Sequence, residues 1–192
     1  MIERRKIFRT SVVCLALAAA GALELMYGCA VRHLPGGATA PATNFEQILA
    51  WNAAVAQANS GFADNVIGLQ QSAMLTIPEA KTILVGQATI AAADKRITDR
   101  ISAAASCAAT EAGTTATAAE LNAAAVGCAA ISGPAIATDI NLILGAISDL
   151  TTSGLSPVKD PVKKQALVEL LGTIQALVQN IFSSLKSQGV VK

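Results

Sequence analysis

The sequence predicts an all-α protein, an up-down antiparallel four-helix bundle, and three observations support this fold class. Four helix-start signals are spread along residues 43–192. Each start is followed by apolar side chains at three- and four-residue steps, the spacing of one face of a helix. The segments between these stretches are short, which favours antiparallel packing of consecutive helices. Residues 1–42 lie outside this pattern and carry signals of another kind.

Three of the four starts are Thr-x-x-Glu capping boxes, in which the Thr and Glu side chains satisfy backbone amides of the first helical turn. These pairs are Thr43 with Glu46, Thr76 with Glu79, and Thr117 with Glu120. The fourth start is Asp160 followed by Pro161, a capping carboxylate before a proline at the first helical position. Four starts predict four helices.

The first two helices are expected over about Asn44 to Leu75 and about Pro78 to Ala112. The first has a broad apolar face of Phe45, Ile48, Leu49, Val55, Phe62, Val66 and Leu69. The second repeats an apolar residue at seven-residue intervals, and its seam comprises Ile83, Ile90, Ile97, Ile101 and Ala104. Both patterns are typical of helices packed in a bundle.

The third helix is expected over Ala118 to about Ser153, and it is expected to break or kink near Gly133-Pro134. A proline inside a helix costs roughly 3 kcal/mol through its missing donor and its ring clash. The fourth helix is expected over about Pro161 to Ser187. Its apolar face comprises Leu167, Leu170, Leu171, Ile174, Leu177, Val178, Ile181 and Leu185.

The N-terminus has the layout of an export signal. Arg4, Arg5, Lys6 and Arg9 precede a run without charges from Ser11 to Leu23. Glu24 interrupts this run before it reaches the roughly 20 apolar residues of a spanning helix. Residues 1–28 are therefore predicted to be a signal peptide that is removed from the mature chain.

The segment Met26-Tyr27-Gly28-Cys29 resembles the cleavage box of bacterial lipoprotein signals. This resemblance covers residues 4–30 and implies that Cys29 carries the lipid after cleavage. It also implies sorting to the outer membrane in a Gram-negative host, because Ala30 rather than Asp follows the cysteine. The alternatives are an ordinary signal, cut near Ala18-Ala19-Ala20 or at Gly28, and a twin-arginine signal at Arg4-Arg5.

Residues 29–42 are predicted to be a flexible tether, since they combine Pro35, Gly36, Gly37 and Pro41 without apolar periodicity. Residues 43–192 are predicted to form the helical bundle domain. The chain is nearly neutral, with a formal net charge of +1, so no footprint for nucleic acid is visible. The densest charged cluster, residues 94–100, is expected to be a solvated face with Lys95–Asp99 and Arg96–Asp99 ion pairs. The alternative is a patch for docking a partner.

The cysteines agree with export to an oxidising compartment. Cys14 would leave with the signal, so Cys107 and Cys128 remain as a pair near the second turn. Antiparallel helices would leave these two residues at heights differing by about 9 Å. A disulfide therefore requires the third helix to start later than its capping box indicates. Two buried free thiols are the alternative.

No catalytic or metal constellation is visible in the sequence. His33 is the single histidine and lies in the expected tether, so no histidine is available to activate a nucleophile in the helical domain. No zinc-type ligand spacing or phosphate-binding loop occurs either, and no cofactor is expected. Phe45, Trp51 and Phe62 are the residues that would line an apolar pocket, although aromatic side chains at helical spacing also form cores.

The expected function is that of a non-enzymatic envelope lipoprotein, a structural or protein-interaction bundle. Its partners would be the membrane, through the N-terminal lipid, and an envelope protein. The alternative is a carrier that encloses an apolar ligand or a lipid between its helices. A carrier requires a cavity beside Trp51 and Phe62, whereas a scaffold would be packed solid.

Overall fold

The protein was analysed as a computed structural model, which describes residues 31–33, 39–41, 44–113 and 116–192. Its chain divides into two compact units, Met1–Pro41 and Ala42–Lys192. The predicted signal peptide, Cys29 and Thr43 lie outside the described residues.

Two short strands lie within the segment predicted to be a tether. β1 (Val31–His33) and β2 (Thr39–Pro41) pair antiparallel, with Val31 opposite Pro41 and His33 opposite Thr39. The sequence did not indicate these strands, because three-residue segments are too short to show an alternating apolar pattern.

The second unit is helical. Its elements are α2 (Asn44–Gln71), α3 (Ile77–Ala112), α4 (Ala118–Ala130), α5 (Gly133–Asp149), the π-helical turn η1 (Leu150–Gly154) and α6 (Pro161–Ser187). The prediction of an all-α domain is confirmed.

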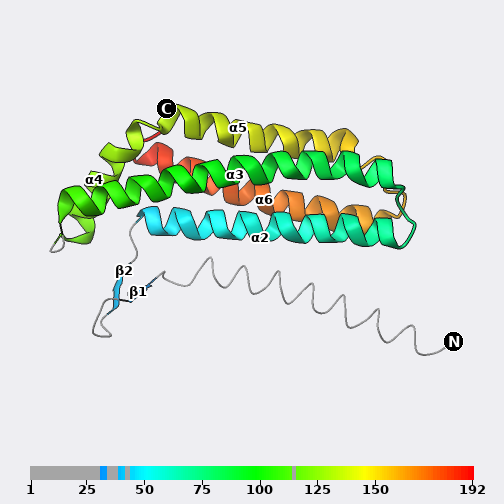
Figure 1. Ribbon diagram of the computed structural model, residues 1–192, viewed down its shortest axis with the longest axis horizontal. Coiled ribbons are helices and arrows are strands. Elements are labelled where there is room, and N and C mark those ends of the chain that lie inside the picture. Colours follow the sequence, from blue (N-terminus) through cyan, green and yellow to red (C-terminus); the bar gives the residue numbers. More distant parts are fainter. Residues whose placement is uncertain (1–30, 34–38, 42–43, 114–115) are drawn as a thin grey trace. The chain divides into compact units, whose positions relative to one another are not determined.

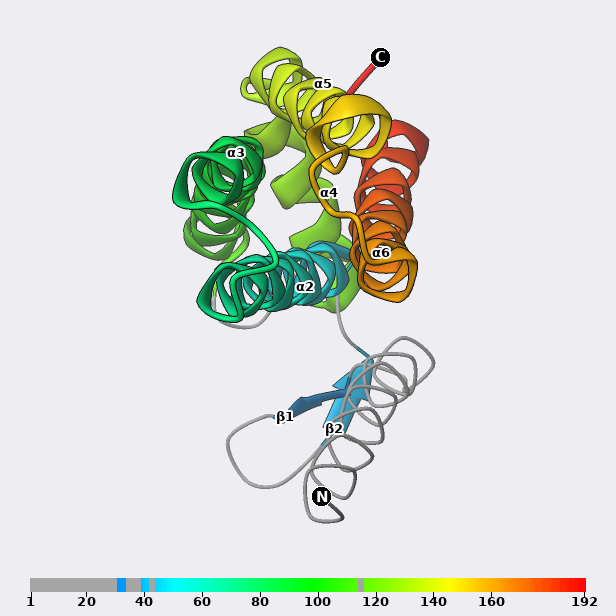
Figure 2. The ribbon, with the colours of Figure 1, turned by 90° about the vertical axis from the view of Figure 1, so that its right-hand side faces the viewer.

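Four long helices surround one core. α2 packs against α3 and α6, α3 also packs against α5, and α5 packs against α6. Seen along the helix axes, these four segments close a ring (Figure 2). The seams between neighbouring helices in this ring are where the polar groups described below are buried.

The predicted break in the third helix is confirmed, and it is sharper than a kink. α4 and the segment Gly133–Gly154 are bent by 78°. Pro134 lies in the first turn of α5, where its missing amide donor costs no hydrogen bond. Gly133 is needed because a side chain there would collide with the carbonyl oxygen of Val190, near the C-terminus. The third segment is therefore two helices, α4 and α5.

The capping signals act as the sequence predicted wherever they are described. The Glu79 side chain accepts a hydrogen bond from the Thr76 amide at 2.8 Å, and the Thr76 hydroxyl accepts one from the Glu79 amide at 3.4 Å. Hydrogen bonds from Thr76 also lower the pKa of the Glu79 carboxyl. Thr117 and Glu120 repeat this arrangement at α4. At α6, Asp160 accepts hydrogen bonds from the amides of residues 162 and 163.

The core consists of the apolar stripes that the sequence indicated, with four polar exceptions. The seam of α3 is buried along its length, and so are most apolar residues of the α6 stripe. The buried polar or charged side chains among the described residues are Asn52, Asn59, Asp94 and Asp139. None of these four was predicted to be buried, and they define the most unusual parts of the interior.

Candidate functional site

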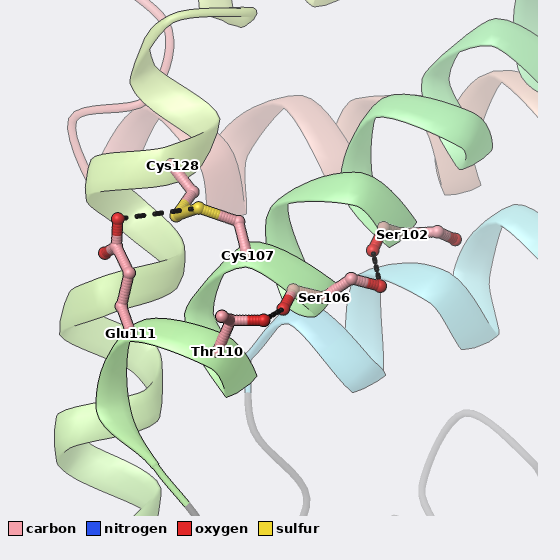
Figure 3. Close-up of a disulfide and its surroundings, with 6 residues drawn as sticks. All are labelled: Ser102, Ser106, Cys107, Thr110, Glu111 and Cys128. Carbon is pink, nitrogen blue, oxygen red and sulfur yellow. Dashed lines mark hydrogen bonds between the residues drawn. A yellow bond between two sulfur atoms is a disulfide. The ribbon is translucent and has the colours of Figure 1, made fainter.

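The two cysteines of the helical unit form a disulfide. Cys107 comes from the last third of α3 and Cys128 from the end of α4, and their Cα atoms are 6.2 Å apart. Figure 3 shows the bond joining two helices that cross steeply. The predicted disulfide is confirmed.

The condition attached to that prediction was wrong. α4 starts directly after Thr117, as its capping box indicates, and does not start later. The calculated height mismatch assumed that α4 runs antiparallel beside α3. Instead α4 crosses α3, so Cys128 reaches Cys107 without a shift of the helix start (Figure 3).

Glu111 lies beside the disulfide, one helical turn after Cys107. Its Oε1 atom is 3.7 Å from the Cys107 sulfur, and ligand atoms of Cys107, Glu111 and Cys128 lie within 4.8 Å of one another. Such a group would suit a metal ion only with the cysteines reduced, because the thiolate is the metal ligand. In the disulfide form the two cysteines link the helices covalently and have no free thiolate.

The three aromatic residues considered for a pocket have different environments. Phe45 is 1% exposed and Phe62 is 0% exposed, and both lie on the buried stripe of α2. Trp51 is half-buried. A groove between two helices of the described part of the chain is lined by none of these three residues.

That groove lies between α2 and α3 and has a volume of about 440 Å³. It is open to solvent along one side. Its lining comprises Ala56, Asn59, Ser60 and Ala63 of α2 and Gln87, Ala91, Asp94, Lys95 and Thr98 of α3. Small side chains on both helices leave this space, and a few polar groups lie within a mainly apolar lining.

Asp94 is the unusual residue of the groove. Its side chain is buried, with the residue only 5% exposed, and it makes no hydrogen bond or ion pair with any described residue. Burial raises the pKa of the Asp94 carboxyl to about 7, because the charged form loses its hydration. The prediction that the charged cluster of residues 94–100 is a solvated face was therefore wrong at Asp94.

Asn59 of α2 also lines this groove, and only part of its hydrogen-bonding capacity is used. Its Nδ2 donates a hydrogen bond to the backbone carbonyl of Gln87 at 3.3 Å, but its Oδ1 is buried without a partner. Asn52, two turns earlier on α2, has no partner for either amide atom. The buried face of α2 therefore carries two asparagines with unused hydrogen-bonding capacity, and one of them, Asn59, lines the groove.

A heptad pattern could have identified these residues in the sequence. On α2 the buried positions alternate at three- and four-residue steps: Phe45, Ile48, Asn52, Val55, Asn59, Phe62, Val66 and Leu69. Asn52 and Asn59 thus occupy the same heptad position as Phe45 and Val66. On α3, Asp94 occupies the heptad position of Ala80, Ile101 and Ala108. A stripe defined by apolar residues alone does not include these polar positions.

The other buried carboxylate is fully paired. Asp139 of α5 is 4% exposed. Its Oδ1 accepts a hydrogen bond from Arg96 Nε at 2.8 Å and forms an ion pair with Arg96 Nη2 at 2.7 Å. Its Oδ2 pairs with Arg100 Nη1. Arg96 was expected to pair with Asp99, but Asp99 pairs with Lys95 at 2.7 Å on the exposed face. The two arginines instead link α3 to α5.

By length and composition alone, α6 is sufficiently apolar to cross a membrane, with a mean hydropathy of 1.3. The bent pair of α4 and Gly133–Gly154 also passes this test if it is taken as one span. A core helix of a soluble bundle has the same properties, and α6 buries seven apolar side chains in this unit. The composition of α6 therefore does not distinguish the two situations.

Comparison with protein-family models, with curated proteins and with solved structures found no match for this chain.

Proposed function

We propose that this protein is a non-enzymatic envelope lipoprotein, anchored through Cys29, whose up-down helical bundle serves as a structural or protein-interaction module. In this arrangement α2, α3, α5 and α6 are the four bundle helices, and α4 is a transverse segment fixed to α3. Residues 29–42 connect the bundle to the lipid. Partners would be the membrane and another envelope protein.

The observation that carries the proposal is the disulfide between Cys107 and Cys128. Disulfides form and persist in secreted, periplasmic or extracellular proteins and are rare in the cytosol. Export is also what the basic start and uncharged run of residues 1–28 predict. Two independent features of the sequence and structure therefore support the same compartment.

An interaction module is favoured over a carrier by the way the apolar residues are distributed. Phe45 and Phe62 are packed in the core, so neither lines a space for an apolar ligand. In contrast, Ile77 at the start of α3 and Val162 at the start of α6 are 71% and 75% exposed. Figure 1 shows the starts of these helices at the same end of the bundle. A partner that docks at this end would cover both side chains.

The proposal is tested by intact-mass analysis of protein recovered from the membrane fraction of a bacterial host. The expected mass corresponds to a chain that starts at Cys29 and carries acyl groups. The Cys29→Ser variant is the matched control, and it should lose the acyl mass and leave the membrane fraction. A soluble product cut elsewhere, or a variant with unchanged distribution, would contradict lipid anchoring.

A second measurement addresses the compartment separately. Alkylation of the same protein with and without prior reduction counts the free thiols of Cys107 and Cys128. Export predicts that both resist alkylation until a reductant is added. Two thiols that react directly in freshly isolated protein would remove the main support for export.

A further inference from the structure

The α2–α3 groove combines two features that rarely occur together. It is an open space of about 440 Å³, and two of its lining side chains, Asn59 and Asp94, are more than nine-tenths buried yet retain hydrogen-bond acceptors without donors. Buried polar groups in proteins are almost always paired. An unpaired acceptor beside an open groove can therefore accept a hydrogen bond from a donor that enters the groove.

The chemistry of these acceptors indicates which charge a ligand donor should carry. Asp94 offers carboxylate oxygens and Asn59 offers its amide Oδ1, while the Asn59 Nδ2 already binds the Gln87 carbonyl. An anion would find no free donor on these two residues. The only basic residue of the lining, Lys95, is paired with Asp99 on the exposed face. A positively charged donor is thus the complement of the groove.

A metal ion does not fit these groups. Calcium takes about six to eight oxygen ligands, and magnesium about six in a regular octahedron. The lining supplies one carboxylate to balance a divalent charge, its other side-chain oxygens are neutral, and its walls include Ala56, Ala63 and Ala91. Alanine side chains instead provide an apolar surface beside the carboxylate, which suits a short hydrocarbon chain.

We propose that the α2–α3 groove binds the protonated primary amine of a small molecule, with the ammonium group on Asp94 and Asn59 and its alkyl stem against the alanines. The ammonium N–H groups donate to an Asp94 carboxylate oxygen and to Asn59 Oδ1. Rotation about the last bond of Asp94, which has a broad energy profile, turns a carboxylate oxygen toward the groove, while Asn59 keeps its Nδ2 on the Gln87 carbonyl. This ligand site is independent of lipid anchoring.

Two sources could present such an amine, a free alkylamine or the ethanolamine headgroup of a membrane lipid. Both offer a primary ammonium on a short carbon stem. The groove recognises that shared group, so the experiment includes probes for each source.

The test is a titration of the purified, isotope-labelled full chain, followed by amide NMR shifts at about pH 8. At this pH Asp94 is ionised, because its pKa is about 7, and a primary amine remains protonated. n-Propylamine hydrochloride should shift the resonances of groove residues such as Asn59, Ala91 and Thr98 in a saturable manner. n-Propanol, which lacks the charge, and tetramethylammonium, which lacks N–H donors, should bind at least about tenfold more weakly.

The key variant is Asp94→Asn, which keeps the shape of the side chain and removes its charge. We expect it to weaken n-propylamine binding at least about tenfold. Asp64→Asn is the matched control, because it removes a charge from an exposed position of α2 next to the groove residue Ala63. Thermal unfolding of both variants verifies that they remain folded, and removal of the buried charge at Asp94 is expected to stabilise the fold.

Two soluble headgroup analogues, glycerophosphoethanolamine and glycerophosphocholine, distinguish a lipid headgroup from a free amine as the source of the ammonium group. Binding of the first but not the second assigns the groove to ethanolamine headgroups, whereas binding of n-propylamine alone assigns it to free amines. Either result supports the site. Absence of saturable shifts with every amine, or equal binding by Asp94→Asn and Asp64→Asn, would overturn it.

Discussion

Two aspartates of this protein are buried to nearly the same extent but differ in their partners. Asp94, in the α2–α3 seam, is 5% exposed and has no partner among the described residues. Asp139, in the α3–α5 seam, is 4% exposed and binds two arginines. Both seams share α3, so the same helix supplies the unpaired carboxyl on one side and the paired cations on the other.

The difference shows that burial alone does not decide what a carboxyl contributes. At Asp139 the guanidinium groups of Arg96 and Arg100 replace the lost hydration, and their own exposed portions keep contact with water. At Asp94 nothing replaces it, and the proton affinity of the group rises instead. The charges of the α3–α5 seam therefore link two helices, whereas Asp94 in the α2–α3 seam remains without a protein partner.

The largest effect on stability should follow from removing both arginine partners of Asp139, which leaves it unpaired like Asp94. The double variant Arg96→Met/Arg100→Met leaves a buried carboxylate without partners, which typically costs about 3–5 kcal/mol. Urea unfolding at neutral pH measures this loss as a lower free energy of unfolding. The single variant Arg96→Met retains Arg100 and should lose clearly less; equal losses would show that the two arginines do not share the charge.

The second prediction concerns pH. The folded chain holds the Asp94 proton up to about pH 7, whereas an unfolded aspartate releases it near its model value of 3.8. Stability from this group is therefore present below about pH 4 and is lost as the pH rises to about 7. Between about pH 4.5 and about pH 8 the loss amounts to roughly 3 kcal/mol.

Urea unfolding of the Asp94→Asn variant isolates this contribution. The variant cannot titrate at residue 94, so its free energy of unfolding should fall less than that of the natural protein over the same pH range. It should also be the more stable of the two near pH 8. Parallel pH profiles for both proteins would show that Asp94 is solvated in the fold.

A smaller gain is expected at Asn52, whose two amide atoms are buried without partners. Replacing it with Leu puts an apolar side chain at a heptad position otherwise suited to one, and should raise the free energy of unfolding by about 1 kcal/mol. Asn59→Leu is the comparison, because it also breaks the hydrogen bond to the Gln87 carbonyl. Its gain in thermal stability should be smaller, and the reverse order would contradict the unpaired state of Asn52.

The smallest effect is expected at the exposed pair of Lys95 and Asp99. Their side chains are 75% and 60% exposed, and such pairs contribute little in water. Lys95→Gln should change the free energy of unfolding by less than about 0.5 kcal/mol. A larger loss would mean that this pair also supports the buried seams of α3.

The local parts of the fold were predictable from the sequence, because they depend on nearby residues. The Thr76 and Thr117 boxes cap α3 and α4, and Asp160 caps α6, as expected. The break before Pro134 follows equally from one residue's chemistry. Helix starts, stripes and the break all arise within a few residues of the signal that predicts them.

The direction of α4 and the partners of the buried charges were not predictable in this way. The 78° bend depends on how α4 and α5 pack, and no local signal gives that angle. Asp139 lies 43 residues from Arg96, so spacing along one helix could only suggest the wrong partner, Asp99. The candidate groove was missed for a related reason, since Asp94 resembles its charged neighbours in the sequence and differs from them only in its place on the helix.

The disulfide has a further consequence for cooperativity. α4 buries only Ala125 and Ala129, and a helix of 13 residues is marginal in isolation. The bond between Cys107 and Cys128 keeps α4 at a high effective concentration beside α3, so it redocks after each local opening. The disulfide thus couples the opening of α4, which buries only two alanines, to the longest helix, α3, and its reduction would let α4 open separately.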